Sequence, residues 1–294
     1  MSVTKNDVKL PYQRKKQLQK VIDILKIGGR SQHTIDNYEC AITRFLLFFA
    51  NETISKLTED DILKYMKKEY LRKHCSGNTY NLNLSAINFF YSVNFNKKFN
   101  RKLLPKTKLV KKLPTTIEKN VFINILKNEK SLKHQCWLLL AYSSGLRANE
   151  VASIRIEDII SKEHKLRVLG KRKKERYTVL TDTTIMFLRN YYKKYFAGSK
   201  IKSGYLFKGI KNSNHINTTT ITNYFTSLKK KYKLNDNISF HSLRHSFASN
   251  FIKNGGDQFI LKSMLGHTSL NTTSIYIHTG KDFNNLKGID YEHI

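Results

Sequence analysis

The sequence contains few of the residues that hold small secreted or zinc-binding domains together. Only 3 cysteines and 3 prolines occur among its 294 residues. The cysteines, Cys40, Cys75 and Cys136, are scattered and form no Cys-x-x-Cys pair. This spacing argues against a disulfide framework and against a cysteine-based zinc site. Cys40 and Cys136 lie in apolar helical runs, so we expect both to be small buried side chains.

Acidic residues and long apolar runs are also scarce. The chain has 22 Asp and Glu against 53 Lys and Arg, which gives a formal net charge of +31. Its longest apolar run, "FLLFFA" at 45–50, is far too short to span a bilayer, and the N-terminus lacks the apolar region of a secretory signal. So large an excess of positive charge implies a polyanionic partner. Nucleic acid is the first candidate, an anionic membrane surface is a weaker second, and we expect a cytoplasmic protein.

The first hundred residues have the pattern of amphipathic helices. Four runs, at 17–29, 34–51, 57–71 and 76–95, repeat apolar residues at helical spacing, and Thr58 stands where an N-cap would begin the third. Four such helices predict a small bundle. The predicted core residues are Leu18, Val21, Ile22, Leu25, Ile35, Tyr38, Ile42, Phe45, Phe49, Leu82, Leu84, Ile87 and Tyr91.

A basic segment follows the bundle. Residues 96–114 carry eight Lys and Arg, no acid, and two of the three prolines. Proline and like charges keep such a segment extended. We therefore expect an inter-domain linker at 101–114 that lies against DNA phosphates; a merely solvated linker is the alternative. The predicted DNA-contacting residues, together with two lysines of the later hairpin, are Arg101, Lys102, Lys106, Lys108, Lys111, Lys112, Lys173 and Lys174.

The second domain, from 115 to 294, is predicted to be mostly helical with one small antiparallel sheet. The alternating stretch "KLRVLGKRKKERYTVL" predicts a hairpin. Leu166 and Val168 are expected on one face of its first strand, and Tyr177 and Val179 on the corresponding face of its second. The domains are thus 1–100, a linker at 101–114, and 115–294.

The stretch "HSLRHSFAS" at 241–249 could at first suggest a metal site. His241 and His245 are four residues apart, which on a helix places both on one face. However, Ser242 stands where a zinc helix of the His-Glu-x-x-His kind needs glutamate. We therefore expect neither metal nor cofactor, and we interpret His245 as a buried, hydrogen-bonded structural histidine.

Cleaving a phosphodiester without metal requires a different set of groups. Arginines must clamp the charged oxygens, a hydroxyl must attack, and an acid must protonate the leaving 5′ oxygen. The second domain offers this set in short strings. They are "SSGLRANEV" with Arg147, "GKRKKER" with Lys171, "HSLRHSFAS" with His241 and Arg244, "LGHTS" with His267, and "TTSIYIHT" with Tyr276. Each string alone could be an ordinary helix end, solvated turn or core residue, so the order of the set carries the argument.

Taken in this order, the strings resemble the tyrosine recombinase (phage integrase) family, in its two-domain, Xer-like form. The resemblance covers nearly the whole chain, because "SQHTIDNYECAITRF" and "SGNTYNLNLSAINFFY" are similar to the family's N-terminal signatures. It implies an N-terminal four-helix, SAM-like core-binding bundle that closes on DNA like a clamp, and a catalytic domain. The implied catalytic residues are Arg147, Lys171, His241, Arg244, His267 and the nucleophile Tyr276, with Glu150 as a supporting acid.

The resemblance also implies a mechanism and partners. Tyr276 would form a 3′-phosphotyrosyl link, Lys171 would protonate the 5′ oxygen, and His241 would act as base or phosphate partner. The expected partner is double-stranded DNA with inverted-repeat sites, bound by a homotetramer across two sites in the bacterial nucleoid; any accessory protein is unknown. The expected role is integration, excision or resolution of a mobile element. A chromosome-dimer resolvase, a type IB topoisomerase-like enzyme and a non-enzymatic DNA-binding regulator are the alternatives.

Overall fold

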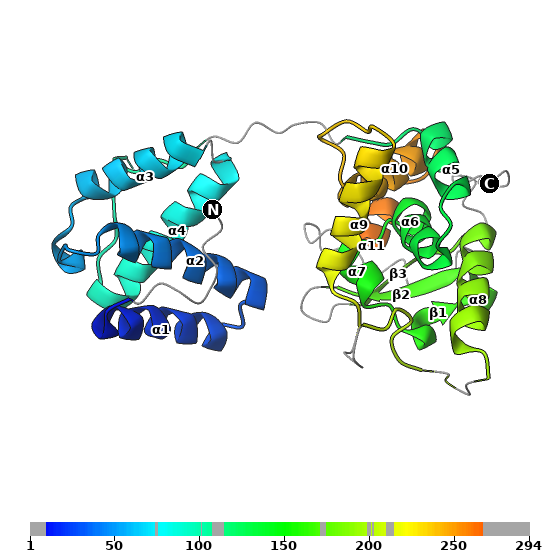
Figure 1. The fold of residues 1–294 in the computed structure, drawn as a ribbon, viewed down its shortest axis with the longest axis horizontal. Helices are drawn as coiled ribbons and strands as arrows, with labels where there is room; N and C mark the ends of the chain where they lie inside the picture. Colours follow the sequence, from blue (N-terminus) through cyan, green and yellow to red (C-terminus); the bar gives the residue numbers. More distant parts are fainter. Residues whose placement is uncertain are drawn as a thin grey trace. The chain divides into compact units, whose positions relative to one another are not determined.

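The structure is a computed structural model, and it describes residues 10–73, 76–100, 102–107, 115–170, 175–198, 201, 203–209 and 215–266. The chain divides into two compact units, residues 1–112 and 113–294. Each unit is mainly helical, and the second also contains a small sheet (Figure 1). The predicted fold class is therefore confirmed.

The first unit is a bundle of four α-helices. They are α1 (Tyr12–Ile27), α2 (Gln32–Phe48), α3 (Glu59–Lys73) and α4 (Gly77–Phe95), with a short 3-10 helix, η1 (Ile54–Lys56), before α3. Helix α4 packs against each of the other three. Ser31 and Ser76 cap α2 and α4, and Thr58 caps α3 as predicted, because its hydroxyl accepts from the amide of Asp61 while the Asp61 carboxylate accepts from the amide of Thr58.

The core of the bundle is apolar and rich in aromatic rings. Phe45 is fully buried and makes edge-on contacts with Phe49, Tyr65 and Tyr91. The Tyr91 hydroxyl donates to the carbonyl oxygen of Ile54 at 2.7 Å, so its one polar atom is satisfied. The predicted core residues of this unit are buried, except for two that are half-buried, Tyr38 and Leu82.

The two described cysteines and the start of the predicted linker differ in how they fit the sequence predictions. Cys40 is exposed, so the prediction of a buried thiol is wrong there, whereas Cys136 is buried as expected. The reason is that Cys40 lies on the side of α2 away from Ile35 and Ile42. The described part of the predicted linker, 102–107, packs onto the bundle: Leu104 belongs to its core, and the amide of Thr107 donates to the Asn81 side chain at 2.9 Å.

The second unit surrounds a central buried helix. Every residue of α6 from Cys136 to Ser144 is buried, and α8 and α10 pack along it (Figure 1). The α-helices are α5 (Lys119–Lys127), α6 (Leu132–Ser144), α7 (Ala148–Ala152), α8 (Asp182–Phe196), α9 (Thr218–Lys231), α10 (Phe240–Lys253) and α11 (Gln258–Leu265), with 3-10 helices η2 (Ile156–Asp158) and η3 (Ser161–Glu163).

The sheet is antiparallel, in the order β1 (Ile159–Ile160), β2 (Lys165–Leu169), β3 (Glu175–Val179). Leu166 and Val168 are buried as predicted. The face predicted for β3 is wrong, because Leu166 lies opposite Thr178 and Val168 opposite Arg176, so these two polar residues point inward. Tyr177 shares the other, half-buried face. Val179 is buried, but against Phe247 and the α11 residues rather than beside Leu166.

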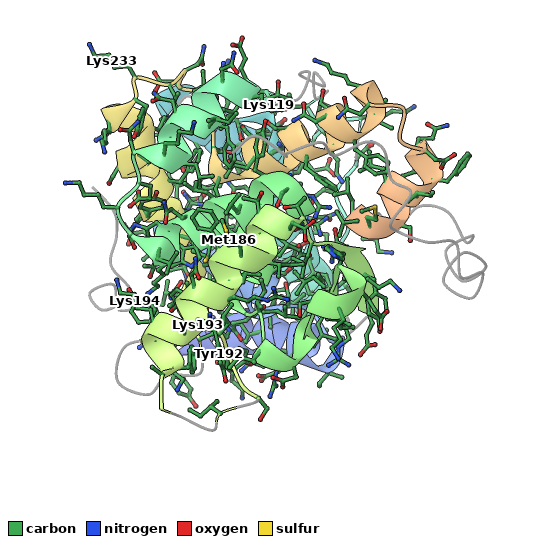
Figure 2. All side chains as sticks on the ribbon, turned by 90° about the vertical axis from the view of Figure 1, so that its right-hand side faces the viewer. Lys119, Met186, Tyr192, Lys193, Lys194 and Lys233 are labelled. Carbon is green, nitrogen blue, oxygen red and sulfur yellow. The ribbon has the colours of Figure 1, made fainter. Side chains whose placement is uncertain are left out.

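Helix α8 carries exposed basic and apolar side chains on the surface of the second unit. Figure 2 shows Met186, Lys193 and Lys194 along α8, and Met186 is 49% exposed. Within the described part of the chain, no helix is both long and apolar enough to cross a membrane.

Candidate active site

Arg147 lies where the central helix α6 ends and α7 begins. Gly145 terminates α6 in the left-handed conformation, with φ of 68°. A side chain there would be strained and would also clash, since an added Cβ would lie 2.5 Å from a ring carbon of Phe247. The tight turn lets the chain start α7 with Arg147 at the N-cap position. Its side chain is 37% exposed and can therefore meet a ligand from solvent.

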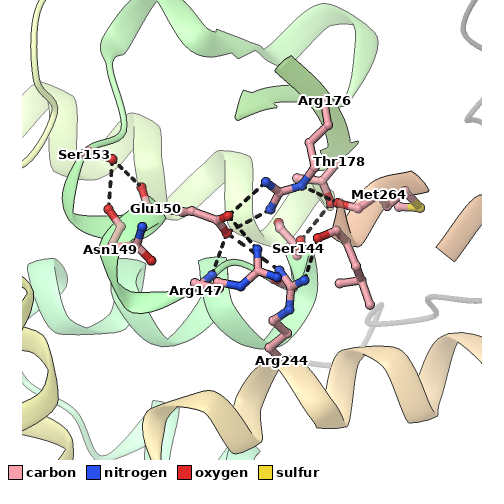
Figure 3. A network of polar contacts seen from close by, with 11 residues as sticks. Ser144, Arg147, Asn149, Glu150, Ser153, Arg176, Thr178, Arg244 and Met264 are labelled. Carbon is pink, nitrogen blue, oxygen red and sulfur yellow. Dashed lines mark hydrogen bonds and ion pairs between the residues drawn. The ribbon is translucent and has the colours of Figure 1, made fainter. Parts of the chain in front are cut away.

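The carboxylate of Glu150 is the centre of a cluster of arginines (Figure 3). It is only 3% exposed, and it accepts from the Arg147 amide at 2.8 Å and from Arg147 Nη1 at 3.0 Å. Arg176 binds the same carboxylate with two parallel bonds, Nη1 to Oε1 at 2.9 Å and Nη2 to Oε2 at 2.8 Å. Burial by itself would raise the pKa of Glu150, but the Arg176 hydrogen bonds and charge, and then Arg147, lower that pKa below its ordinary value.

Arg244 approaches the same cluster from α10. It is 2% exposed, and it donates to the Gly145 carbonyl oxygen at 2.7 Å and to the Leu265 carbonyl oxygen at 2.6 Å. Its Nη1 lies 3.7 Å from Glu150 Oε2. Burial, and then the positive charge of Arg147, lower the pKa of Arg244 to about 10, which leaves it charged at neutral pH.

His241 occupies the start of α10, near this cluster. Helix α10 begins at Phe240, so His241 lies in its first turn, and Arg244, the fifth residue, begins the second turn. The His241 side chain is exposed, although part of its ring is covered. Partial burial of the ring, and then the charges of His245 and Arg244, lower its pKa to about 4. The ring is therefore neutral at pH 7 and can accept a proton or a hydrogen bond.

His245 stands beside His241 and differs from its prediction. The two rings meet edge-on, with centroids 4.7 Å apart. His245 is half-buried rather than buried, because its side of α10 is only partly covered. Among the described residues, no group of three or more His, Cys, Asp or Glu side chains is placed to hold a metal ion.

Arg176 belongs to the site although its sequence context does not predict this. Its side chain is 7% exposed and makes the bidentate pair with Glu150. Arg176 falls at the end of a basic run that suggests a solvated turn, but it also falls on β3 at an inward position. The cross-strand pairing of Arg176 with Val168 appears only in the structure, so no signal in the sequence alone identifies it.

The structure thus brings together four of the predicted site residues: Arg147, Glu150, His241 and Arg244. Their electrostatic influence on one another is direct, since the pKa of His241 responds to the other three. Of the predicted DNA-contacting residues, Lys102 and Lys106 are described and both are exposed. The remaining predicted site residues lie outside the described part of the chain: Lys171, His267, Tyr276, Arg101, Lys108, Lys111, Lys112, Lys173 and Lys174.

Comparison with known families identifies the family to which this chain belongs. Residues 113–282 match the model of the phage integrase family. The chain belongs to this family. Its N-terminal part agrees, because residues 18–100 match the SAM-like N-terminal domain of phage integrases. The protein is therefore a tyrosine recombinase, a class of enzyme for site-specific recombination.

Curated relatives and solved structures agree with this family assignment. The chain is 29% identical to tyrosine recombinase XerC of Psychromonas ingrahamii, over 89% of this chain and 90% of that protein. It is 30% identical to tyrosine recombinase XerA of Pyrococcus horikoshii, over 88% and 87%. Among solved structures, a lambda integrase tetramer bound to a Holliday junction has the same fold, with a TM-score of 0.69 and 17% identity over 99% of this chain and 81% of that chain.

Proposed function

We propose that this phage integrase family member cleaves and rejoins DNA through a 3′-phosphotyrosyl intermediate on Tyr276. The observation that carries the proposal is the meeting of Arg147 and Arg244, from strings far apart in the sequence, at one buried carboxylate. A buried acid held by several arginines leaves net positive charge at the surface. That charge suits the phosphate of a DNA strand.

In the proposed reaction, the Tyr276 oxygen attacks the scissile phosphorus and the bond to the 5′ oxygen breaks. His241, neutral at pH 7, accepts the tyrosine proton or bonds the phosphate. Lys171 supplies the proton that the leaving 5′ oxygen needs. The charges of Arg147 and Arg244, with a hydrogen bond from His267, stabilise the charge that develops on the non-bridging oxygens.

Rejoining reverses these steps with a different strand. The 5′ hydroxyl of a partner duplex attacks the phosphotyrosine, a new phosphodiester forms, and Tyr276 recovers its proton. The covalent link conserves the energy of the broken bond, so the cycle consumes neither ATP nor another cofactor.

DNA is the partner that the family and the charge of +31 both favour. We propose that the first unit is the core-binding domain and that both units contact the duplex, with exposed Lys102 and Lys106 on phosphates. The other six predicted contacts would add to this set. Four protomers would assemble on two inverted-repeat sites, as the lambda integrase tetramer does on its junction.

The nucleophile is tested with a DNA duplex that carries a nick beside the scissile phosphate, so that cleavage traps the covalent adduct. The wild-type protein should give a protein–DNA adduct on a denaturing gel, and Tyr276→Phe should give none. Tyr291→Phe is the matched control and should react like the wild type. Adduct formation by Tyr276→Phe would overturn the assignment.

Strand exchange, rather than simple relaxation, separates a recombinase from a topoisomerase. A plasmid with two recombination sites should yield deletion or inversion products, according to the relative orientation of the sites. A supercoiled plasmid without a site pair should remain supercoiled, and its efficient relaxation would favour the topoisomerase-like alternative.

We propose integration, excision or resolution of a mobile element as the biological role. The alternative, resolution of chromosome dimers, has the similarity to Xer-named relatives in its favour. Sequencing the DNA beside the gene tests the choice. An inverted-repeat pair at the ends of a mobile element that carries the gene supports our proposal. A site confined to the chromosomal replication terminus supports the alternative.

A further inference from the structure

Arg176 is a buried cation beside the candidate active site, and the proposed reaction gives it no role. Both oxygens of Glu150 are bound by its Nη1 and Nη2, while its Nε donates to the carbonyl oxygen of Met264 at 2.7 Å (Figure 3). An arginine so placed, 7% exposed, is held by three hydrogen bonds in one plane.

The ion pair between Arg176 and Glu150 determines how much of Arg147 is free to face solvent. Because Arg176 engages both carboxylate oxygens, Arg147 has a single guanidinium contact with Glu150, at 3.0 Å, and stays 37% exposed. Without Arg176, the buried carboxylate would draw on the two remaining arginines, Arg147 and Arg244, to offset its charge. Arg176 therefore neutralises Glu150 and leaves the charge of Arg147 for a ligand.

The hydrogen bond to the Met264 carbonyl oxygen connects the Arg176 side chain to the last turn of α11. The carbonyl oxygens at a helix C-terminus lack intrahelical partners and carry partial negative charge. Arg176 takes that of Met264, and Arg244 takes the next one, on Leu265. Two buried arginines thus bind consecutive carbonyls, and the second of these belongs to Leu265, the first residue of the string that contains His267.

Gly266 makes this approach possible. Its φ is 65°, and a Cβ added to it would lie 2.9 Å from Arg176 Cδ. Only glycine therefore allows the backbone next to His267 to pack directly on the Arg176 side chain. Arg176 lies on β3 and belongs to the string "GKRKKER", which also contains Lys171, so one side chain connects three of the five strings.

We propose that Arg176 is a positioning residue for strand cleavage: it holds Glu150 so that Arg147 faces the scissile phosphate, and it fixes the end of α11. This inference rests on the proposed function. Its effect passes through Glu150 and Arg147, so it concerns the rate of the chemical step rather than the affinity for DNA.

The first test measures single-turnover cleavage of the nicked duplex at saturating DNA for Arg176→Lys, which keeps the charge but loses the fork. The rate constant should fall roughly 10- to 100-fold, because misplacing a reacting group by about 1 Å can cost about 100-fold in rate. The half-saturating DNA concentration should stay within about threefold. A matched control is Arg167→Lys on the neighbouring strand, whose partner is Asp158, at 2.9 Å; it should cleave within about twofold of wild type.

A merely structural role gives a different result. Misfolding of part of the Arg176→Lys sample would lower the amplitude of the single-turnover reaction and leave its rate constant unchanged. That outcome, or a rate constant equal to wild type, would overturn the proposal. Absence of any adduct with the wild-type protein would instead contradict the proposed function, so the two failures are distinguishable.

Two further measurements test the route through Glu150. The double variant Arg176→Lys with Glu150→Gln should have a cleavage rate constant within about threefold of that of the slower single variant. The effects should not add, because the two residues act as one unit. A substrate with sulfur in place of the bridging 5′ oxygen needs no proton on its leaving group. It should restore cleavage by Lys171→Ala but not by Arg176→Lys. Full additivity, or restoration of Arg176→Lys by sulfur, would overturn this route.

Discussion

The two units of this recombinase bury different kinds of side chain. In the described part of the first unit, the core is aliphatic and aromatic, and its buried charged or amide side chains are Glu69 and Asn83. The second unit has a larger apolar core, but it also buries Glu150, Arg176 and Arg244 together. Both units fold around apolar stripes, and among the residues that the structure describes the buried charge cluster lies in the second unit.

The proposed roles of the two units would account for this difference. A binding surface contacts phosphates with solvated lysines and arginines, which need no burial. A cleavage site must hold cations in fixed positions where charge develops, and burial provides that order at the cost of desolvation. The structure offsets this cost with helix-end carbonyl oxygens and with one acid shared by three arginines.

The largest expected effect tests the apolar core of the first unit. Phe45→Ala removes a ring that contacts three others and should lower the free energy of unfolding of this unit by about 3–5 kcal/mol. Urea denaturation followed by circular dichroism measures it. The neighbouring Phe48, 41% exposed, is the control, and its alanine variant should lose less than half as much. Equal losses would contradict the burial difference.

The next effect tests the charge cluster of the second unit. Arg147→Ala removes one cation from the phosphate site and should slow single-turnover cleavage about 100- to 1,000-fold. Its side chain is partly exposed, so the free energy of unfolding should change by less than about 1 kcal/mol. A loss of stability as large as that of Phe45→Ala, with an unchanged cleavage rate, would assign Arg147 to scaffolding.

A smaller effect concerns the binding surface. Replacing both Lys102 and Lys106 with alanine should reduce the slope of log affinity against log salt by roughly 2, or about 0.9 for each phosphate that the protein no longer neutralises. Fluorescence anisotropy with labelled DNA measures the slope. Lys193 and Lys194, exposed on α8, are replaced in a control variant that removes the same charge, and that variant should keep the wild-type slope. Equal slopes for both variants would contradict a specific role for the 102–107 segment.

The smallest effect is the titration of His241. Its pKa, about 4 in the free protein, lies below the 6.5 of an unfolded chain. The unfolded state therefore takes up the proton first, and the contribution of His241 to stability is present above pH 6.5 and is lost as pH falls towards 4. NMR of the ring protons, assigned with His241→Gln, should show a midpoint below 5.5. A midpoint at or above 6.5 would contradict the partial burial and cationic surroundings of the ring.

The sequence predicts those parts of the molecule that rest on local periodicity. The stripe from Leu18 to Leu25 is buried as its spacing indicates, and Thr58 caps its helix because both partners lie within four residues. The inward face of β3 was assigned wrongly because Arg176 and Thr178 occupy core positions. Their partners, Glu150 and the Ser144 carbonyl, are distant in sequence, and no local pattern reveals them.

The candidate site also contains residues that the sequence predicts and residues that it does not. Arg147, His241 and Arg244 could be found because each stands in a short string at a helix end, and the strings occur in a recognisable order. Arg176 could not be separated from a solvated basic turn. The burial of Arg244 under two helix-end carbonyls also depends on tertiary packing, through Gly145 and Leu265.

The central claim is that this chain forms a covalent bond to DNA through one particular tyrosine. Mass spectrometry of peptides from the trapped adduct identifies the linked residue directly. We expect a nucleotide phosphate on Tyr276, in the peptide that contains "TTSIYIHT". A phosphate on Tyr291, or on any other residue, would contradict it.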